Sequence, residues 1–329
     1  MSDAADLHKR ASLDLRPAQC CICETDDAEP LAVGEDFEYR TSGDFFLAMR
    51  CRTCGLVYLN PRPSFQELDR IYPENYHAFQ FTQSHYGFVY KVRCRLETRR
   101  LLSWCSGLNE DARIIDVGCG DGFHLRLLRD FGRATWKLEG VDNSPRAVQV
   151  ATRAGLLVHH GIVEDLALNA AAYDMALLIQ TIEHVGDPPA VLDAVRRLLK
   201  PGGRLVIVTD NTDSLDFKIF KGRHWGGYHF PRHWNLFNAR TLAALANKAG
   251  LEVEAIKTMT SPVNWVYSIR NALVDLGCPS WLTNRFGLAS PIALGVFTTF
   301  DMLHQLAGRG ALVRAILRRP APVERPAAN

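Results

Sequence analysis

The sequence predicts an α/β fold in which a mostly parallel β-sheet is covered by helices on both faces. Between residues 112 and 258, short apolar runs alternate with amphipathic stretches, which is the pattern of repeated strand–helix units. The apolar runs are continuous rather than alternating, as in strands that are buried on both faces. At roughly 150 residues per domain, a chain of 329 residues leaves room for a second, smaller unit.

The elements of this sheet can be placed in order along the chain. The expected strands are residues 113–117, 138–141, 156–158, 175–179 and 205–208, and the helices between them are 122–131, 145–154 and 187–199. A helix over 239–249, ended by Gly250, and a strand over 251–257 follow. A last strand is expected over 311–317. The intervening residues 261–310 are then a helical insertion, because so long a bare loop is uncommon.

The segments before and after the sheet have a different character. Residues 1–17 are polar and residues 320–329 are rich in Pro and Ala, so both are predicted to be disordered tails. Residues 63–108 read as a helical connector that starts with Ser64 as a cap and Glu67 three positions later. The sheet domain is then expected to span 109–319.

The charge balance argues against a nucleic-acid partner. The chain has 38 basic and 36 acidic side chains, for a net charge of +2. The N-terminus lacks the apolar core of a signal peptide. The longest uncharged apolar stretch, residues 286–300, is shorter than the roughly 20 residues that cross a bilayer. These observations predict a soluble, cytoplasmic protein.

Four of the nine cysteines form two Cys-x-x-Cys pairs, Cys20 with Cys23 and Cys51 with Cys54. In a reducing compartment this spacing favours a metal over disulfides. Four thiolates suit tetrahedral zinc, and a site closed by four protein ligands is structural rather than catalytic. Residues 18–62 are therefore predicted to be a zinc-binding region. Cys21 is an alternative to Cys20 as a ligand.

The most informative motif is the glycine-rich turn Gly118-Cys-Gly120-Asp-Gly122, which joins an apolar strand to a helix. Glycine is required where the backbone approaches a ligand closely or takes positive φ. No Lys-Ser/Thr follows, so the turn is not a phosphate-binding P-loop. Asp116 at the end of the strand disfavours a pyrophosphate and suits a cationic group. Asp142, at the end of the next strand, can accept the hydroxyls of a ribose. The ligand is therefore expected to contain a nucleoside without phosphates.

These motifs resemble the class I S-adenosylmethionine-dependent methyltransferases over about residues 110–320. Leu199–Leu205 looks like the family's turn before its fifth strand, Ile182–Pro188 looks like its segment after the fourth, and Gly161–Asp165 occupies the place of its adenine contact. The resemblance implies a Rossmann-like methyltransferase sheet with S-adenosylmethionine as cofactor. It implies cofactor contacts by Asp116, Gly118, Gly120, Gly122, Asp142, Val163, Glu164, Gln180 and His184.

The front of the chain resembles one branch of that family. Cys51–Pro63 is similar to the zinc-binding segment of methyltransferases that act on sugars, and Tyr72–Tyr76 looks like their aromatic stretch near the site entrance. The resemblance implies methylation of a hydroxyl or carbon of a small acceptor: a sugar, a nucleotide-sugar or a lipid-linked saccharide.

An acceptor hydroxyl or acidic carbon needs a base, and histidine is the usual one. The loop over 210–237, at the carboxyl edge of the sheet, is rich in aromatic and basic side chains. By resemblance His233 is the expected base, with Tyr228 and His229 lining the pocket, and His229 is the alternative base. Arg223 and Arg232 could hold a phosphate or a carboxylate of the acceptor.

Other interpretations stay open at this stage. Residues 261–310 are either a helical lid that also forms a homodimer face, or an interfacial membrane patch assisted by nearby arginines. These arginines are Arg309, Arg314, Arg318 and Arg319. The alternative functions are a ribosomal-RNA base methyltransferase with a zinc ribbon that reads RNA, and a non-catalytic protein that binds S-adenosylmethionine. Residues 18–62 lack the basic surface that the RNA reader needs, because eight acids outnumber four arginines.

Overall fold

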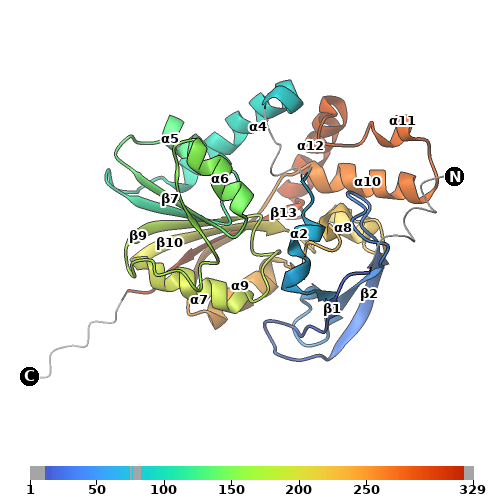
Figure 1. The fold of residues 1–329 in the computed structure, drawn as a ribbon, viewed down its shortest axis with the longest axis horizontal. Helices are drawn as coiled ribbons and strands as arrows, with labels where there is room; N and C mark the ends of the chain where they lie inside the picture. Colours follow the sequence, from blue (N-terminus) through green and yellow to red (C-terminus); the bar gives the residue numbers. More distant parts are fainter. Residues whose placement is uncertain (1–11, 75, 77–82, 322–329) are drawn as a thin grey trace, which may run out of the picture.

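The structure is a computed structural model and describes residues 12–74, 76 and 83–321. A seven-stranded sheet with helices on both faces forms the larger part, and a small four-stranded sheet lies beside it (Figure 1). The predicted tail over 320–329 lies outside the described residues, apart from its first two positions.

The large sheet confirms the predicted α/β fold. Its strand order is β12-β13-β10-β9-β6-β7-β8, in which β13 runs antiparallel to both neighbours and the other pairs are parallel. The strands are β6 (Arg113–Val117), β7 (Lys137–Asp142), β8 (Leu157–His160), β9 (Tyr173–Ile179), β10 (Leu199–Asp210), β12 (Glu252–Met259) and β13 (Leu312–Arg318). The carboxyl ends of β6, β7, β9 and β10 therefore meet along one edge of the sheet.

Helices cover each face of this sheet (Figure 1). Their apolar side chains are buried against it. One face is covered by α7 (Pro188–Leu198) and α9 (Ala239–Lys248), and the other by α4 (Gln83–Trp104) and α5 (Phe123–Phe131), with α6 (Pro145–Arg153) beside α5. Polar caps fix where several of these helices begin. The Asp187 side chain accepts from the Ala190 amide, and Asn238 forms a capping box with Thr241.

The predicted helical insertion between the last two strands is present. It contains α10 (Val263–Asp275), α11 (Ser280–Thr283) and α12 (Pro291–Leu306). Buried Asp301 holds it to the sheet, because its carboxylate accepts from the Ser261 and Ala311 amides and from the Trp265 indole. Among the described residues, none of the helices is both long enough and apolar enough to span a membrane.

The small sheet combines three N-terminal strands with one from the larger part. Its order is β11-β4-β3-β2, with β2 (Ala28–Gly34), β3 (Phe46–Cys51), β4 (Val57–Leu59) and β11 (Asn235–Leu236). Strand β11 comes from the loop after β10, which also contains α8 (Leu215–Phe220) and the short helix η2 (Gly226–Tyr228). The N-terminal region is thus joined to the sheet domain by backbone hydrogen bonds.

Two expectations about the first 70 residues are corrected. Residues 12–17 are not a disordered tail, because Leu13 is buried and β1 (Leu15–Arg16) pairs with β5 (Arg62–Pro63). Ser64 precedes a short helix, η1 (Phe65–Glu67), but its side chain makes no capping hydrogen bond. Glu67 instead accepts from the Asp14 amide, which ties the N-terminal segment to η1 and to α2 (Leu68–Ile71).

Candidate functional site

The glycine turn after β6 has the open space that a ligand requires. Gly118 and Gly120 have φ of +74° and +55°, and a Cβ placed on Gly120 would meet no atom within 4 Å. Asp116, at the end of β6, is 1% exposed, and its Oδ2 has no hydrogen-bond partner among the described residues. His124 Nδ1 lies 3.7 Å from the same oxygen, beyond hydrogen-bond distance. A buried carboxylate oxygen that accepts no hydrogen bond from the described residues, beside an open glycine turn, fits a cationic ligand group.

Asp142 lies at the end of β7 and faces the same turn. Its carboxylate accepts from the Gly120 amide at 2.8 Å and from the Ser144 amide at 2.9 Å. A carboxylate has about four acceptor positions, so further hydroxyl donors can be accommodated. Burial raises the pKa of Asp142 from its ordinary value, although the two amides oppose this shift. The arrangement fits the predicted ribose contact.

The third glycine of the turn serves packing. Gly122 has φ of +79°, and a Cβ on it would lie 2.2 Å from Leu156 and 3.3 Å from Ala151. Its amide donates to the Cys119 carbonyl. The absence of a side chain at Gly122 therefore lets α5 approach α6 and β8.

The remaining predicted cofactor residues follow neighbouring strands. Val163 is buried in the core, and Glu164 is half-buried, with a pKa raised by burial. Gln180, directly after β9, has φ of +53°, and its amide group donates to Glu183 Oε1 at 2.8 Å. Thr181 was not predicted, but its side chain packs against Gly118 and so borders the turn.

Three histidines meet where β9 and β10 end. The ring centroids of His184 and His233 are 4.5 Å apart, those of His229 and His233 are 5.0 Å apart, and those of His184 and His229 are 6.4 Å apart. The sequence prediction named all three, and the structure brings them together. Ligand atoms of Glu183, His184 and His233 also lie within 4.8 Å of one another.

His229 is paired with a carboxylate from the N-terminal region. Its Nδ1 lies 2.6 Å from Glu38 Oε1, and the two side chains are only 6% and 8% exposed. The contact joins residues 191 positions apart in the chain. His229 also has φ of +39°, which is uncommon for a residue with a side chain and directs the imidazole away from the path of η2.

His233 has a different environment. Its Nδ1 lies 2.7 Å from the Gly227 carbonyl, which can only accept, so Nδ1 carries the proton. Burial and the neighbouring imidazoles hold the pKa of His233 well below its ordinary value. Asp210 lies 3.4 Å away, and burial raises the pKa of that carboxyl to about 7. His233 is therefore a neutral imidazole in a fixed orientation.

Tyrosines from the N-terminal region surround the histidines. The Tyr72 hydroxyl lies 2.9 Å from His184 Nδ1, and the ring of Tyr76 contacts those of Tyr72, Tyr39 and His229. The sequence placed Tyr72 and Tyr76 near the site, and their contacts agree. Asn75, between them, lies outside the described residues.

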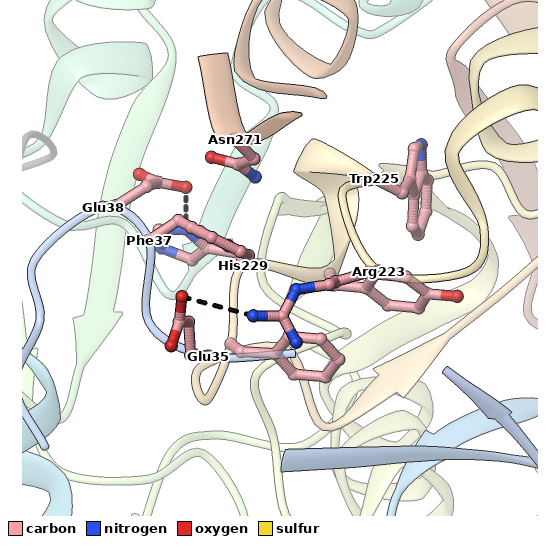
Figure 2. A pocket seen from close by; sticks show the side chains of 9 residues that line it. Glu35, Phe37, Glu38, Arg223, Trp225, His229 and Asn271 are labelled. Carbon is pink, nitrogen blue, oxygen red and sulfur yellow. Dashed lines mark hydrogen bonds and ion pairs between the residues drawn. The ribbon is translucent and has the colours of Figure 1, made fainter. Parts of the chain in front are cut away.

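A small, partly open pocket lies in front of His229 (Figure 2). Figure 2 shows Glu38 bonded to His229 on one side and Glu35 paired with Arg223 on the other, with Asn271 of α10 above them. Its lining residues are Glu35, Phe37, Glu38, Arg223, Trp225, Tyr228, His229, Phe230 and Asn271. Tyr228 contributes its ring, because its hydroxyl donates to the Lys221 carbonyl.

Arg232 is not available to hold an acceptor phosphate or carboxylate, contrary to the sequence expectation. It is fully buried, and its guanidinium pairs with Asp36 at 2.9 and 3.1 Å. The guanidinium also lies 4.5 Å from the centre of the Tyr39 ring and donates to the Ile71 carbonyl. Arg232 thus holds the N-terminal region against the histidine loop.

Asp36 and Glu38 are residues next to the histidine loop that sequence reasoning missed. Both were counted as surface acids when the charge of residues 18–62 was weighed, yet both are buried against the loop after β10. Their only signal is their position in a segment rich in acids, and nothing in the pattern distinguishes them from Glu35.

The four predicted metal cysteines are brought together. The sulfur atoms of Cys20, Cys23, Cys51 and Cys54 all lie within 4.8 Å of one another. Cys21 is not part of this group. The geometry therefore selects Cys20 over its neighbour, which the sequence alone had left open.

Comparison with known proteins identifies the larger part of the chain. Residues 88–256 match the family model described as "Methyltransferase domain". The chain belongs to this methyltransferase family. It is 34% identical over 169 residues to a ubiquinone biosynthesis O-methyltransferase of Cereibacter sphaeroides, covering 48% of this chain and 67% of the relative. The counterpart in Xanthomonas axonopodis pv. citri is 33% identical over 160 residues, covering 45% and 66%.

Solved structures with similar folds include methyltransferases from two thermophiles. A SAM-dependent methyltransferase from Archaeoglobus fulgidus has a TM-score of 0.48 at 18% identity, covering 73% of this chain and 98% of its own. A possible histamine N-methyltransferase from Thermotoga maritima has a TM-score of 0.44 at 21% identity, covering 74% and 100%.

The protein is thus an S-adenosylmethionine-dependent methyltransferase. Asp116 and the open turn at Gly120 fit the charged methionine end of that cofactor, and Asp142 fits its ribose. Bound S-adenosylmethionine supplies an electrophilic methyl group. The chain's own residues must then bind the acceptor, align it and take up its proton.

Proposed function

We propose that this methyltransferase acts on a hydroxyl oxygen of a small acceptor bound in the pocket in front of His229, with His229 as the general base. The buried pair of His229 and Glu38, 2.6 Å apart, carries the proposal. A carboxylate on Nδ1 fixes the ring orientation and stabilises the imidazolium that forms when the ring accepts a proton.

His229 is favoured over His233 by two observations. The pocket is lined by His229 and not by His233. The Nδ1 of His233 faces a backbone carbonyl, and the depressed pKa of His233 makes it a poor proton acceptor. His233 and Tyr72 instead hold His184 and His229 in place through ring contacts and the hydrogen bond to His184.

The pocket supports an acceptor with several hydroxyl groups, such as a sugar or a saccharide. Glu35, Arg223 and Asn271 offer charged and amide groups on one rim, while Phe37 and Trp225 offer apolar faces. Such a mixture suits a ring that has polar edges and an apolar face. A phenolic hydroxyl is the second candidate, because the relatives are named ubiquinone biosynthesis O-methyltransferases.

Transfer of labelled methyl groups from S-adenosylmethionine to fractionated extract tests both candidates. The wild-type protein is expected to label a saccharide or nucleotide-sugar fraction. If the acceptor is instead a phenolic hydroxyl, the label should appear in phenolic lipids. Because the Glu183–His184–His233 cluster offers two imidazoles and a carboxylate, the assay is run with and without an added divalent transition metal. Label confined to RNA would contradict the proposal and favour the ribosomal-RNA interpretation.

His229→Gln should lower kcat by about 10²–10⁴ without changing the affinity for S-adenosylmethionine. Glu38→Gln should lower kcat less, because the ring loses the charge that stabilises it after it takes up a proton. Arg133→Gln, at an exposed residue before the start of β7 and so at the opposite edge of the sheet, is the control. Full turnover in His229→Gln would place the base elsewhere.

We also propose that Cys20, Cys23, Cys51 and Cys54 bind a structural zinc ion. Their sulfur atoms are already clustered, and four thiolates leave no open coordination position for chemistry. Metal analysis of the purified protein should give one zinc per chain. Cys20→Ser and Cys51→Ser should lose the metal, whereas Cys21→Ser and Cys94→Ser should keep it. Metal-free wild-type protein with an unchanged melting curve would refute the proposal.

A further inference from the structure

The outward face of α4 carries two parallel rows of side chains. Phe88, Val92 and Leu96 are 73%, 39% and 44% exposed and recur every four residues. Lys91, Arg95 and Arg99 form a second exposed row with the same spacing. Residues four apart lie above one another on a helix, so an apolar row runs beside a cationic row. Among the described residues, no acidic side chain is recorded in an ion pair with these three cations.

The inward face of the same helix is well packed. Leu101 and Trp104 are buried with the core of the sheet, and the rings of Tyr90 and Phe123 are in contact at 6.2 Å. The Arg93 guanidinium also lies over the Phe123 ring. Phe123 is the first residue of α5, directly after the glycine turn. The exposed face is thus the outer side of a rigid element beside the cofactor loop.

Helix α12 adds further exposed apolar surface next to the end of α4. Arg100 of α4 donates to the Thr260 carbonyl, and the Thr260 hydroxyl bonds to Gln305 of α12. The only Asp, Glu, Lys or Arg of α12 is Asp301, which is buried. Its large exposed apolar residues are Ile292, Val296, Phe300, Met302, Leu303 and Leu306.

We propose that this α4/α12 surface binds the surface of an anionic lipid bilayer. Exposed apolar side chains enter the headgroup region while the flanking cations contact lipid phosphates. A second copy of the chain fits less well, because pairing two such faces would bring two cationic rows together. Nucleic acid fits less well, because the apolar row from Phe88 to Leu96 would face charged phosphates.

Three of the four cations that the sequence offered for a membrane patch contact other parts of the chain. Arg314 lies over the Trp104 ring, and Arg318 and Arg319 donate to the backbone carbonyls of Gly202 and Leu199. The lipid-facing charge comes instead from α4, which lies before the 261–310 insertion. The inference does not depend on the identity of the methyl acceptor.

Flotation of the full chain with vesicles tests the proposal. Vesicles of phosphatidylcholine with about one third phosphatidylglycerol should bind the protein, vesicles of phosphatidylcholine alone should bind it much less, and high salt should release it. Each cation near the surface contributes about fivefold, so Lys91→Ser with Arg95→Ser should weaken binding about 30-fold. Phe88→Ser should weaken it as well.

Matched controls use exposed residues elsewhere on the domain. Arg153→Ser on α6 and Phe131→Ser on α5 should leave vesicle binding unchanged. Absence of binding to anionic vesicles, or equal losses in the control variants, would overturn the proposal. A concentration-dependent dimer that Phe88→Ser converts to monomer, without vesicle binding by the wild type, would assign the face to a second copy. Failure of methyl transfer with intact vesicle binding would affect only the proposed function.

Discussion

Asp36→Asn should destabilise the protein strongly, because it removes one charge of a buried pair. Asp36 is 2% exposed and Arg232 is fully buried, and their atoms meet at 2.9 and 3.1 Å. The Arg232 guanidinium and the amides of Tyr39 and Thr41 offset the cost of burial and lower the pKa of Asp36 from 3.8 to about 2. Asparagine leaves the arginine charge without a counter-charge in the core.

The structure sets the size of this effect. A pKa lowered by nearly two units corresponds to about 2.5 kcal/mol of stabilisation by the charged form. Leaving a partner charge buried and unpaired typically costs ~3–5 kcal/mol. We therefore expect a loss of ~3–5 kcal/mol from a total that is ~5–15 kcal/mol for most domains. Since the folded-state pKa is depressed, this contribution is complete above pH 4 and is lost as the pH falls towards 2.

Urea unfolding at pH 7 and pH 3, followed by tryptophan fluorescence, measures the free energy of unfolding. The control is Asp27→Asn, which removes an exposed pair with Arg52 and should cost less than about 1 kcal/mol. The double variant Asp36→Leu with Arg232→Met should be more stable than Asp36→Asn alone, because no unpaired charge remains. Equal unfolding midpoints for Asp36→Asn and Asp27→Asn would refute the reasoning.

Three further outcomes follow from the site. Asp142→Ala should weaken S-adenosylmethionine binding at least 100-fold, because charge-assisted hydrogen bonds to the ribose are lost. Calorimetry measures this affinity, and an unchanged value would refute the ribose assignment. Gly122→Ala should lower stability by ~1–3 kcal/mol, because its Cβ would lie 2.2 Å from Leu156. Gly202→Ala is the control, because Gly202 has a similar φ and a Cβ on it would meet no atom within 4 Å. In thermal unfolding it should lower stability less than Gly122→Ala, and equal losses would contradict the packing role of Gly122. Tyr72→Phe should lower kcat about tenfold with cofactor affinity retained, because the contact with His184 at 2.9 Å is lost, and unaltered kcat would remove Tyr72 from the site.

The sequence predicted the large sheet well because its signals are local. A strand buried on both faces must be a continuous apolar run, and the turn between Asp116 and Gly122 needs glycine at each position with positive φ. The expected strand boundaries differ from the observed ones by only a few residues, except in β10, which begins at Leu199. There the Pro-Gly-Gly segment interrupts the apolar run, and the pairing of β10 with β9 is irregular between Leu199 and Arg204.

The surroundings of the three histidines were harder to predict, because their contacts are not local. Glu38 meets His229 and Asp36 meets Arg232 across 191 and 196 residues. The sequence does not distinguish a buried carboxylate from an exposed one. The difference depends on which residue the carboxylate meets in the folded protein. The same reason explains why Arg232 was expected to bind an acceptor and instead binds Asp36.

The two halves of the site also come from different parts of the chain. The methyltransferase family match begins at residue 88, and it includes Asp116, Asp142 and the histidines. Glu38, Tyr39, Tyr72 and Tyr76 lie before it and reach the histidines because β11 and the Asp36–Arg232 pair hold the small sheet in place. The region matched by the family model therefore contains Asp116, Asp142 and the three histidines, while the N-terminal region supplies side chains that contact those histidines. With the proposed zinc site, Cys51→Ser should consequently reduce methyl transfer before it reduces S-adenosylmethionine binding, and equal losses of both would contradict this separation.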